Sequence, residues 1–144
     1  MLSDCMTLVR TLARLCRLLE HSDAGLTLPQ YRLLALVAEG DERAGSLAGR
    51  LSLSKPTVTA AVDGLVERGL VVRAVVAGDR RAVRIAITPR GIDALEAAES
   101  AMRARLQPVL DRCADEIAVL AAFDQLQQAL DQAVHHGVSE AASR

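Results

Sequence analysis

Aromatic side chains are almost missing from this chain of 144 residues, which has no tryptophan, one tyrosine (Tyr31) and one phenylalanine (Phe123). Long hydrophobic runs are missing too. Although 51% of the residues are apolar, no run approaches the roughly 18 residues that a membrane-spanning helix needs. The apolar residues are therefore spread along amphipathic elements. The composition predicts a folded protein without a membrane segment, because a chain this hydrophobic does not stay disordered.

Sequence features of export and catalysis are also lacking. The first ten residues carry an acid before any base and no small-residue cleavage site, so we expect no export signal and a cytoplasmic protein. There is no Gly-rich phosphate loop, and no serine or cysteine accompanies the three histidines and a carboxylate at a recognisable motif spacing. We expect no enzymatic activity and no cofactor.

A metal site near the C-terminus is one alternative reading of the histidines. Asp131 and His135 lie at i and i+4, on the same side of a helix, and His136 is adjacent. Neighbouring histidines at a helix C-terminus are more typical of surface groups that the helix dipole favours. We therefore predict no metal site.

Cysteine occurs three times, as Cys5, Cys16 and Cys113, without the CxxC spacing of a zinc site. An odd number of cysteines also argues against a disulfide framework. All three fall on apolar stripes of expected helices. We expect them to be small buried hydrophobic residues.

Positive charge is concentrated in the middle of the chain. The net charge of the whole chain is −1, but residues 28–92 hold ten Arg or Lys and six Asp or Glu, a local charge of +4. The remainder holds seven basic and twelve acidic residues, a charge of −5. A basic central module of this kind indicates a partner such as nucleic acid.

The stretch 45–69 has the pattern of two short helices joined by a turn. Apolar residues recur at helical spacing, at Leu47, Ala48, Leu51, Val58, Val62, Leu65 and Val66. Ser54 stands at the N-cap of the second helix, and Pro56 is tolerated in its first turn. Gly69 supplies the left-handed residue after that helix. These features predict a helix-turn-helix.

A β-hairpin is expected to follow. The stretches 70–76 and 82–88 are rich in β-branched residues, and the second has apolar residues on one face, at Val83, Ile85 and Ile87. The turn between them carries Asp79, Arg80 and Arg81. Arginine on a thin hairpin suits a narrow DNA minor groove, where the potential is most negative. We predict a mainly α fold with a small β-hairpin wing, that is, a winged helix-turn-helix.

The outer face of the second helix is small and polar, which permits close approach to the DNA major groove. The residues expected there are Ser54, Lys55, Pro56, Thr57, Thr59 and Ala60. Arg73 is expected to contact a phosphate. The alternative for the same pattern is a winged-helix module that serves only protein–protein contact.

Four segments carry a family resemblance: LTLPQYRLLALV at 26–37, SLAGRLSLSKPTVTAAVDGLVERGLVVR at 46–73, DRR at 79–81 and ITPRG at 87–91. Together they resemble the MarR family of winged-helix transcription regulators. The Asp-x-Arg of the wing, followed by a hydrophobic-Thr-x-x-Gly strand exit, is the most specific of them. The resemblance implies that Arg81 is the minor-groove arginine and that Asp79 is its brace.

The resemblance further implies a repressor that a small effector releases from DNA. The expected effector pocket lies in the crevice between the dimerising helices and the winged module. It is lined by Arg14, Arg17, Tyr31 and Arg32, because an acid or phenol suits arginine and apolar walls. The alternative for Tyr31 is a side chain packed in the core. A thiol-based redox sensor is the alternative, since Cys5 lies near the start of the first helix, as the sensing cysteine does in some relatives.

Helical stripes flank the winged region on both sides. The first covers residues 5–19, and a last helix is expected from about Asp115 to near Gly137, with Pro108 kinking the helix before it. Thr27 and Gln30 have the spacing of a capping box for the helix that follows them.

We therefore expect an N-terminal dimerisation helix at 1–25, a winged helix-turn-helix region at 26–91 and C-terminal dimerisation helices at 92–144. A two-fold homodimer would space two reading helices roughly 34 Å apart on double-stranded DNA, over a pseudo-palindromic operator. An intramolecular helical bundle is the competing arrangement of the same stripes.

Overall fold

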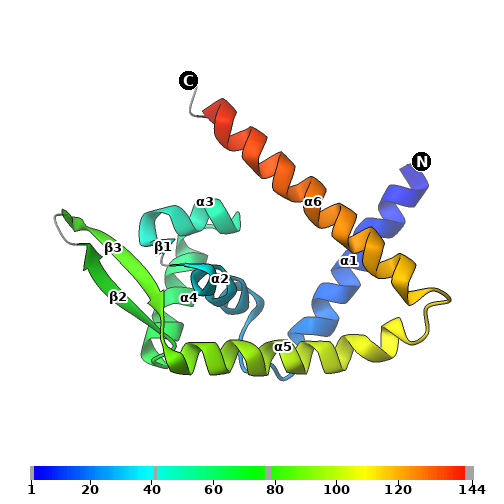
Figure 1. The fold of residues 1–144 in the computed structure, drawn as a ribbon, viewed down its shortest axis with the longest axis horizontal. Coiled ribbons are helices and arrows are strands. Elements are labelled where there is room, and N and C mark those ends of the chain that lie inside the picture. The colour runs from blue at the N-terminus through cyan, green and yellow to red at the C-terminus, as the bar shows by residue number, and fades with distance from the viewer. Residues whose placement is uncertain (1, 41, 77–78, 142–144) are drawn as a thin grey trace. The chain divides into compact units, whose positions relative to one another are not determined.

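The computed structural model of the chain describes residues 2–40, 42–76 and 79–141, and for residues 2–4, 76, 79–82 and 134–141 it describes the backbone alone. The elements in chain order are α1 (Leu2–Glu20), α2 (Leu28–Glu39), β1 (Glu42–Arg43), a 3₁₀ turn η1 (Ala44–Ser46), α3 (Leu47–Leu51), α4 (Lys55–Glu67), β2 (Val71–Val76), β3 (Asp79–Ile87), α5 (Pro89–Leu110) and α6 (Glu116–Ala141) (Figure 1). The predicted fold class, mainly α with a small β-hairpin wing, is confirmed. Contacts divide the chain into two units, residues 1–106 and 107–144.

The starts of α2 and α4 form as the sequence predicts. At α2 the Gln30 N–H donates to Thr27 Oγ1 at 3.3 Å, and the Thr27 N–H donates back to Gln30 Oε1 at 3.1 Å, which completes the capping box. At α4 the Thr57 N–H donates to Ser54 Oγ at 3.3 Å. Gly69 follows α4 with φ +70°, the left-handed conformation that glycine adopts without steric penalty.

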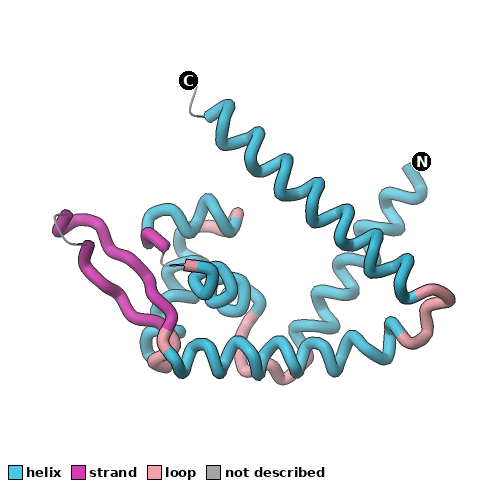
Figure 2. The backbone as a smooth tube through the Cα atoms, viewed as in Figure 1, coloured by secondary structure: helices cyan, strands magenta, loops and turns pink. Residues whose placement is uncertain are grey.

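The sheet has three antiparallel strands in the order β1-β3-β2. Figure 2 shows the hairpin of β2 and β3 in magenta, extending beyond the helices α2 to α4. In the hairpin Arg73 pairs with Ile85 and Val76 pairs with Asp79, with an irregularity between Val75 and Val76. β3 thus begins three residues before the predicted strand, because backbone pairing continues past the last apolar side chain.

β1 (Glu42–Arg43) is absent from the sequence prediction. Glu42 pairs with Ile85 and Arg43 with Arg84, on the other edge of β3. Two charged residues have no alternating apolar pattern, so their strand character comes from the partner strand alone. The sheet consequently gains an edge that anchors the chain entering α3.

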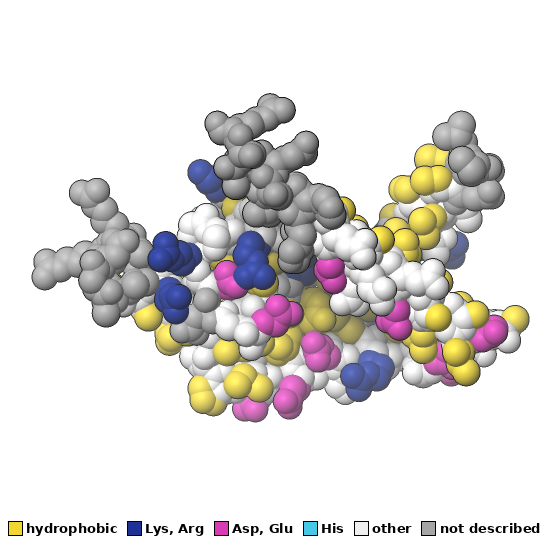
Figure 3. All heavy atoms as spheres, turned by 45° about the horizontal axis from the view of Figure 1, so that its top comes forward, with side chains coloured by type: hydrophobic (Ala, Val, Ile, Leu, Met, Phe, Trp, Pro, Cys, Tyr) yellow, Lys and Arg dark blue, Asp and Glu magenta, His cyan; other side chains and the backbone are white. Residues whose placement is uncertain are grey.

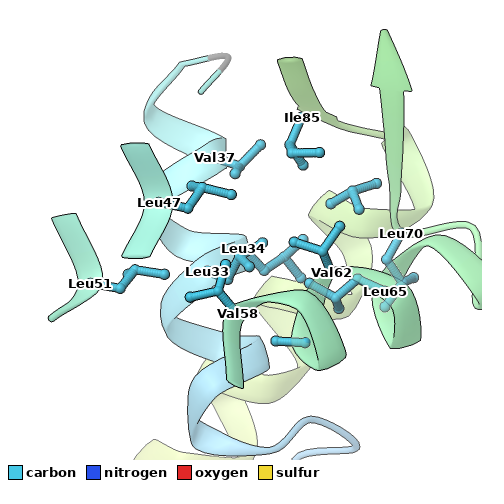
Figure 4. Close-up of a cluster of buried hydrophobic side chains, with 12 residues drawn as sticks. Leu33, Leu34, Val37, Leu47, Leu51, Val58, Val62, Leu65, Leu70 and Ile85 are labelled. Atoms are coloured by element: carbon cyan, nitrogen blue, oxygen red, sulfur yellow. The ribbon is translucent and has the colours of Figure 1, made fainter. Parts of the chain in front are cut away.

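The core lies between α2, α3, α4 and the sheet. Figure 4 shows the buried side chains of these elements pointing toward one another. The largest fully buried ones are Leu33, Leu34, Val37, Leu47, Leu65, Val71 and Ile85. The inner face of α4 is sealed in this cluster through Val58, Ala61, Val62 and Leu65. The helix is therefore held at a fixed rotation about its axis, with its other face outward.

The apolar stripe of α1 stays exposed in the single chain, and yellow side chains lie along the helix in Figure 3. Met6, Leu8, Val9 and Leu12 are exposed. Cys5 and Cys16 are exposed as well and Cys113 is partly buried, so the predicted burial of the cysteines is wrong for the isolated chain. The physical reason is that an apolar stripe is buried only where a partner covers it.

In the second unit α6 begins as predicted, since the Ala118 N–H donates to Asp115 Oδ1 at 2.9 Å. The helix does not end near Gly137 but continues to Ala141, because a helix interior tolerates glycine at about 1 kcal/mol. Ile117, Leu120, Phe123, Leu126 and Leu130 are exposed along it. Within the described ranges, every helix is too short or too polar to cross a membrane.

Candidate DNA-binding surface

The predicted major-groove residues lie on the outward face of α4 or at its N-terminus. Lys55, Pro56, Thr59 and Ala60 are exposed, whereas Thr57 is half-buried. Among the described side chains, no ion pair involves Lys55. Because the helix dipole places partial positive charge at the same end, this ammonium group and the first turn of α4 both favour an anion such as phosphate.

Ser54 and Thr57 contribute mainly to the structure of the turn. Their hydroxyls lie 2.7 Å apart, and Ser54 Oγ also accepts from the Thr57 N–H. Both side chains are thereby held at the helix start. Ser54 is exposed, so one face of this hydroxyl pair remains open to a ligand.

Arg73, the predicted phosphate contact, forms an ion pair with Asp63 across the boundary between α4 and β2. The sequence motifs did not identify Asp63 as a site residue. The sequence could have identified Asp63 by its place on the outer face of α4, three residues after Ala60. A carboxylate is unusual on a surface that is expected to meet phosphate. The pair ties the helix to the wing strand.

The wing residues Asp79, Arg80 and Arg81 lie at the start of β3, whose backbone pairs with β2. Their side chains lie outside the described residues. The assignments of Arg81 as the minor-groove arginine and of Asp79 as its brace therefore stay predictions.

Two further arginines join α3 to neighbouring elements. Arg32 of α2 donates through Nη2 to the carbonyl oxygen of Leu51, the last residue of α3, at 2.5 Å. Arg50 of α3 forms an ion pair with Glu42 of β1. Arg32 is thus engaged with the end of α3, although the sequence predicted it in an effector pocket.

Of the four predicted effector residues, the structure brings Arg14 and Arg17 together. With Leu18, His21 and Arg105 they line an open depression between α1 and α5. Arg105 Nη2 donates to the His21 carbonyl at 3.2 Å, and His21 Nδ1 donates to the Arg17 carbonyl at 2.7 Å. The lining therefore carries three guanidinium groups and one imidazole.

Tyr31 lies elsewhere, against α5. Its hydroxyl donates to Glu99 Oε1 at 3.5 Å, in a partly buried environment. Burial raises the pKa of the Tyr31 phenol above its ordinary value, and the charge of Glu99 and the hydrogen bond to it raise it further. Tyr31 is accordingly a neutral donor that links α2 to α5.

The cluster of Asp131, His135 and His136 cannot be assembled from the described atoms, since the side chains of both histidines lie outside the described residues. Within the described part of the chain, no group of three or more His, Cys, Asp or Glu side chains is placed to hold a metal ion.

The succession α2-α3-α4 followed by the β2-β3 hairpin, with the outer face of α4 exposed, is that of a winged helix-turn-helix protein. Residues 24–82 match the model of the MarR family. Residues 24–82 are thus similar to the MarR family, and most of the chain shares its fold with a solved regulator of that family.

Three solved structures illustrate the shared fold. A MarR-family transcriptional regulator from Rhodococcus sp. RHA1 has a TM-score of 0.75 and 24% identity, over 93% of this chain and 95% of that chain. CouR from Rhodococcus jostii RHA1, bound to p-coumaroyl-CoA, has a TM-score of 0.72 and 25% identity, over 93% and 94%. BpsR from Bordetella bronchiseptica, whose DNA binding is regulated by 6-hydroxynicotinic acid, has a TM-score of 0.70 and 20% identity, over 88% of this chain and 91% of that chain.

Proposed function

We propose that this chain is a sequence-specific regulator of transcription that binds double-stranded DNA and acts in the cytoplasm as a homodimer. The observation that carries the proposal is the asymmetry of α4. Its inner face is sealed in the core while its outer face, with Lys55, Pro56, Thr59 and Ala60, is open beside the wing. A helix presented in this way fits the major groove.

The exposed apolar stripes support the homodimer. α1 exposes Leu8, Val9 and Leu12, and α6 exposes Phe123 and Leu130. Apolar stripes of this length need a partner, and a second copy of the chain would supply one with two-fold symmetry. The operator is then a pseudo-palindrome with half-sites about one helical turn apart. Sedimentation of the full chain separates this dimer from a monomeric bundle.

DNA binding is tested by fluorescence anisotropy with duplexes selected from genomic fragments that the protein retains. Arg81→Ala should weaken operator binding by about 1–3 kcal/mol per subunit, the scale of one specific contact. Arg103→Ala, which removes an exposed arginine of α5 outside the winged region, should leave binding unchanged. If the parent protein retains no fragment at low salt, the chain serves a protein–protein contact instead.

A small organic anion is the effector that the depression between α1 and α5 suits best, because Arg14, Arg17 and Arg105 converge there. Its binding would lower DNA affinity only to the extent that it prefers the conformation that does not fit DNA. In this scheme the protein is a repressor that the effector releases.

The effector proposal is tested with p-coumaroyl-CoA and 6-hydroxynicotinic acid, the ligands of CouR and BpsR, as first probes. Either compound should raise the Kd for operator DNA in the parent protein and lose this effect in Arg14→Gln with Arg105→Gln. Arg10→Gln, an exposed arginine of α1 outside the depression, is the matched control. An effect that survives the double substitution would place the effector elsewhere.

A further inference from the structure

The outer face of α4 carries a carboxylate among the groups expected to face DNA. Ala60 lies four residues after Pro56, and Asp63 lies three residues after Ala60, so all three share one side of the helix. All three are exposed. A ligand that lies against Ala60 therefore comes close to the Asp63 carboxylate.

We propose that Asp63 is a specificity-determining residue that weakens binding to DNA of arbitrary sequence, by holding Arg73 in an ion pair and by presenting its own charge to the phosphate backbone. This inference rests on the proposed DNA-binding function. It assigns to the Asp63–Arg73 pair the task of keeping one cation of the wing strand away from phosphate.

The exposure of the pair supports this assignment. The Arg73 side chain is 46% exposed and the Asp63 side chain 57%, so both partners lie where a phosphate could compete for the guanidinium. The other described ion pair differs, because the Glu42 carboxylate that holds Arg50 is only 15% exposed. An ion pair exposed on both sides contributes little to stability. Electrostatics toward DNA is the better explanation of the carboxylate.

Among the coloured side chains on the face shown in Figure 3, Lys and Arg are interspersed with Asp and Glu. Binding to arbitrary sequences depends almost wholly on the number of cations that meet phosphates. A cation beside the outer face of α4 that an acid retains, as Asp63 retains Arg73, therefore adds less to non-specific binding, while base contacts are unaffected.

The test measures binding of a 30-bp random-sequence duplex between 0.05 and 0.3 M NaCl. Asp63→Asn should steepen the slope of log K against log[NaCl] by about 0.9 per bound subunit and tighten binding about tenfold at the lowest salt. The ratio of operator to random-sequence affinity should fall. Arg73→Gln, which leaves Asp63 without its partner, should weaken binding to the random duplex.

Two controls separate the role of this pair from a general effect of net charge. Glu42→Gln makes the same change in charge and frees Arg50, but it should leave the slope at the parent value. Asp63→Asn combined with Arg73→Gln should return the slope to that of the parent, since the freed cation is then missing.

The inference is overturned if Asp63→Asn leaves the slope unchanged or weakens binding, if Glu42→Gln steepens it equally, or if the double variant keeps the steeper slope. A parent protein that binds neither random nor selected duplexes at 0.05 M NaCl would overturn the proposed function together with this inference. A parent that binds, with an Asp63→Asn variant that behaves like it, would overturn the inference alone.

Discussion

Gly91, in the first turn of α5, lies so close to the carbonyl oxygen of Leu70 that a Cβ atom on Gly91 would be 2.0 Å from it. The same junction is held by Thr88, whose hydroxyl donates to the Gly69 carbonyl at 2.7 Å and accepts from the Gly91 N–H at 3.0 Å. The start of α5 is therefore joined to the segment that connects α4 to the wing. A side chain added at Gly91 would displace backbone, because the atom that it would meet is the backbone oxygen of Leu70.

Gly91→Ala should destabilise the protein by about 3 kcal/mol, at the upper end of the usual cost of overpacking. Thermal or urea unfolding followed by circular dichroism measures the loss. Gly49→Ala is the matched control, since nothing lies within 4 Å of a Cβ at this position of α3. There the better helix propensity of alanine should add up to about 1 kcal/mol. Equal stability of the two variants would contradict the close contact.

Tyr31 should titrate above the ordinary tyrosine pKa. The chain has one tyrosine and no tryptophan, so tyrosinate absorbance at 295 nm reports Tyr31 alone. We expect a midpoint above the ordinary value of about 10 in the folded protein and a return to that value in urea. Glu99→Gln should lower the folded midpoint, because it removes the negative charge that opposes ionisation of the phenol.

The same shift makes stability depend on alkaline pH. Because the folded chain holds the phenol proton more tightly than the unfolded chain, this contribution is fully present below the unfolded pKa of about 10. It is lost as the pH rises through the raised folded pKa. Tyr31→Phe should show a flatter decline of Tm between pH 9 and 11 than the parent. An identical decline in both proteins would argue against the raised pKa.

Ser54→Ala should destabilise the protein by about 1 kcal/mol, since it removes the oxygen that accepts from the Thr57 N–H at the start of α4. Ser54→Asp keeps a good N-cap and should keep the stability, but it adds negative charge at the end expected to meet phosphate. Measuring both Tm and DNA affinity therefore separates the capping role from the DNA contact. A Ser54→Asp variant that binds DNA like the parent would place Ser54 outside the interface.

Lys55→Ala should make the negative slope of log K against log[NaCl] shallower by about 0.9 per bound subunit, because one phosphate is then no longer neutralised by a cation. The slope is measured with the random-sequence duplex used for Asp63. Lys55→Arg should restore it, and Arg103→Ala should not change it. An unchanged slope in Lys55→Ala would show that this ammonium group does not bind phosphate.

Local sequence determined the helix-turn-helix and its boundaries. The cap at Ser54, the capping box at Thr27 and the left-handed Gly69 each depend on residues within one turn, so the sequence contains their full cause. The strands of the wing were likewise predictable. The apolar residues Val83, Ile85 and Ile87 alternate along the chain, and in a hairpin packed on a core this pattern fixes which side of the strand faces the core.

Tertiary structure alone decided which distant groups meet. β1 exists because β3 offers it an edge, Tyr31 meets Glu99 across 68 residues, and Asp63 holds Arg73 through the approach of β2 to α4. None of these contacts leaves a periodic trace in the sequence, since each depends on how separate elements pack. The exposure of Cys5 has the same origin. An apolar stripe predicts that a helix packs against a partner, but it does not indicate whether that partner belongs to the same chain.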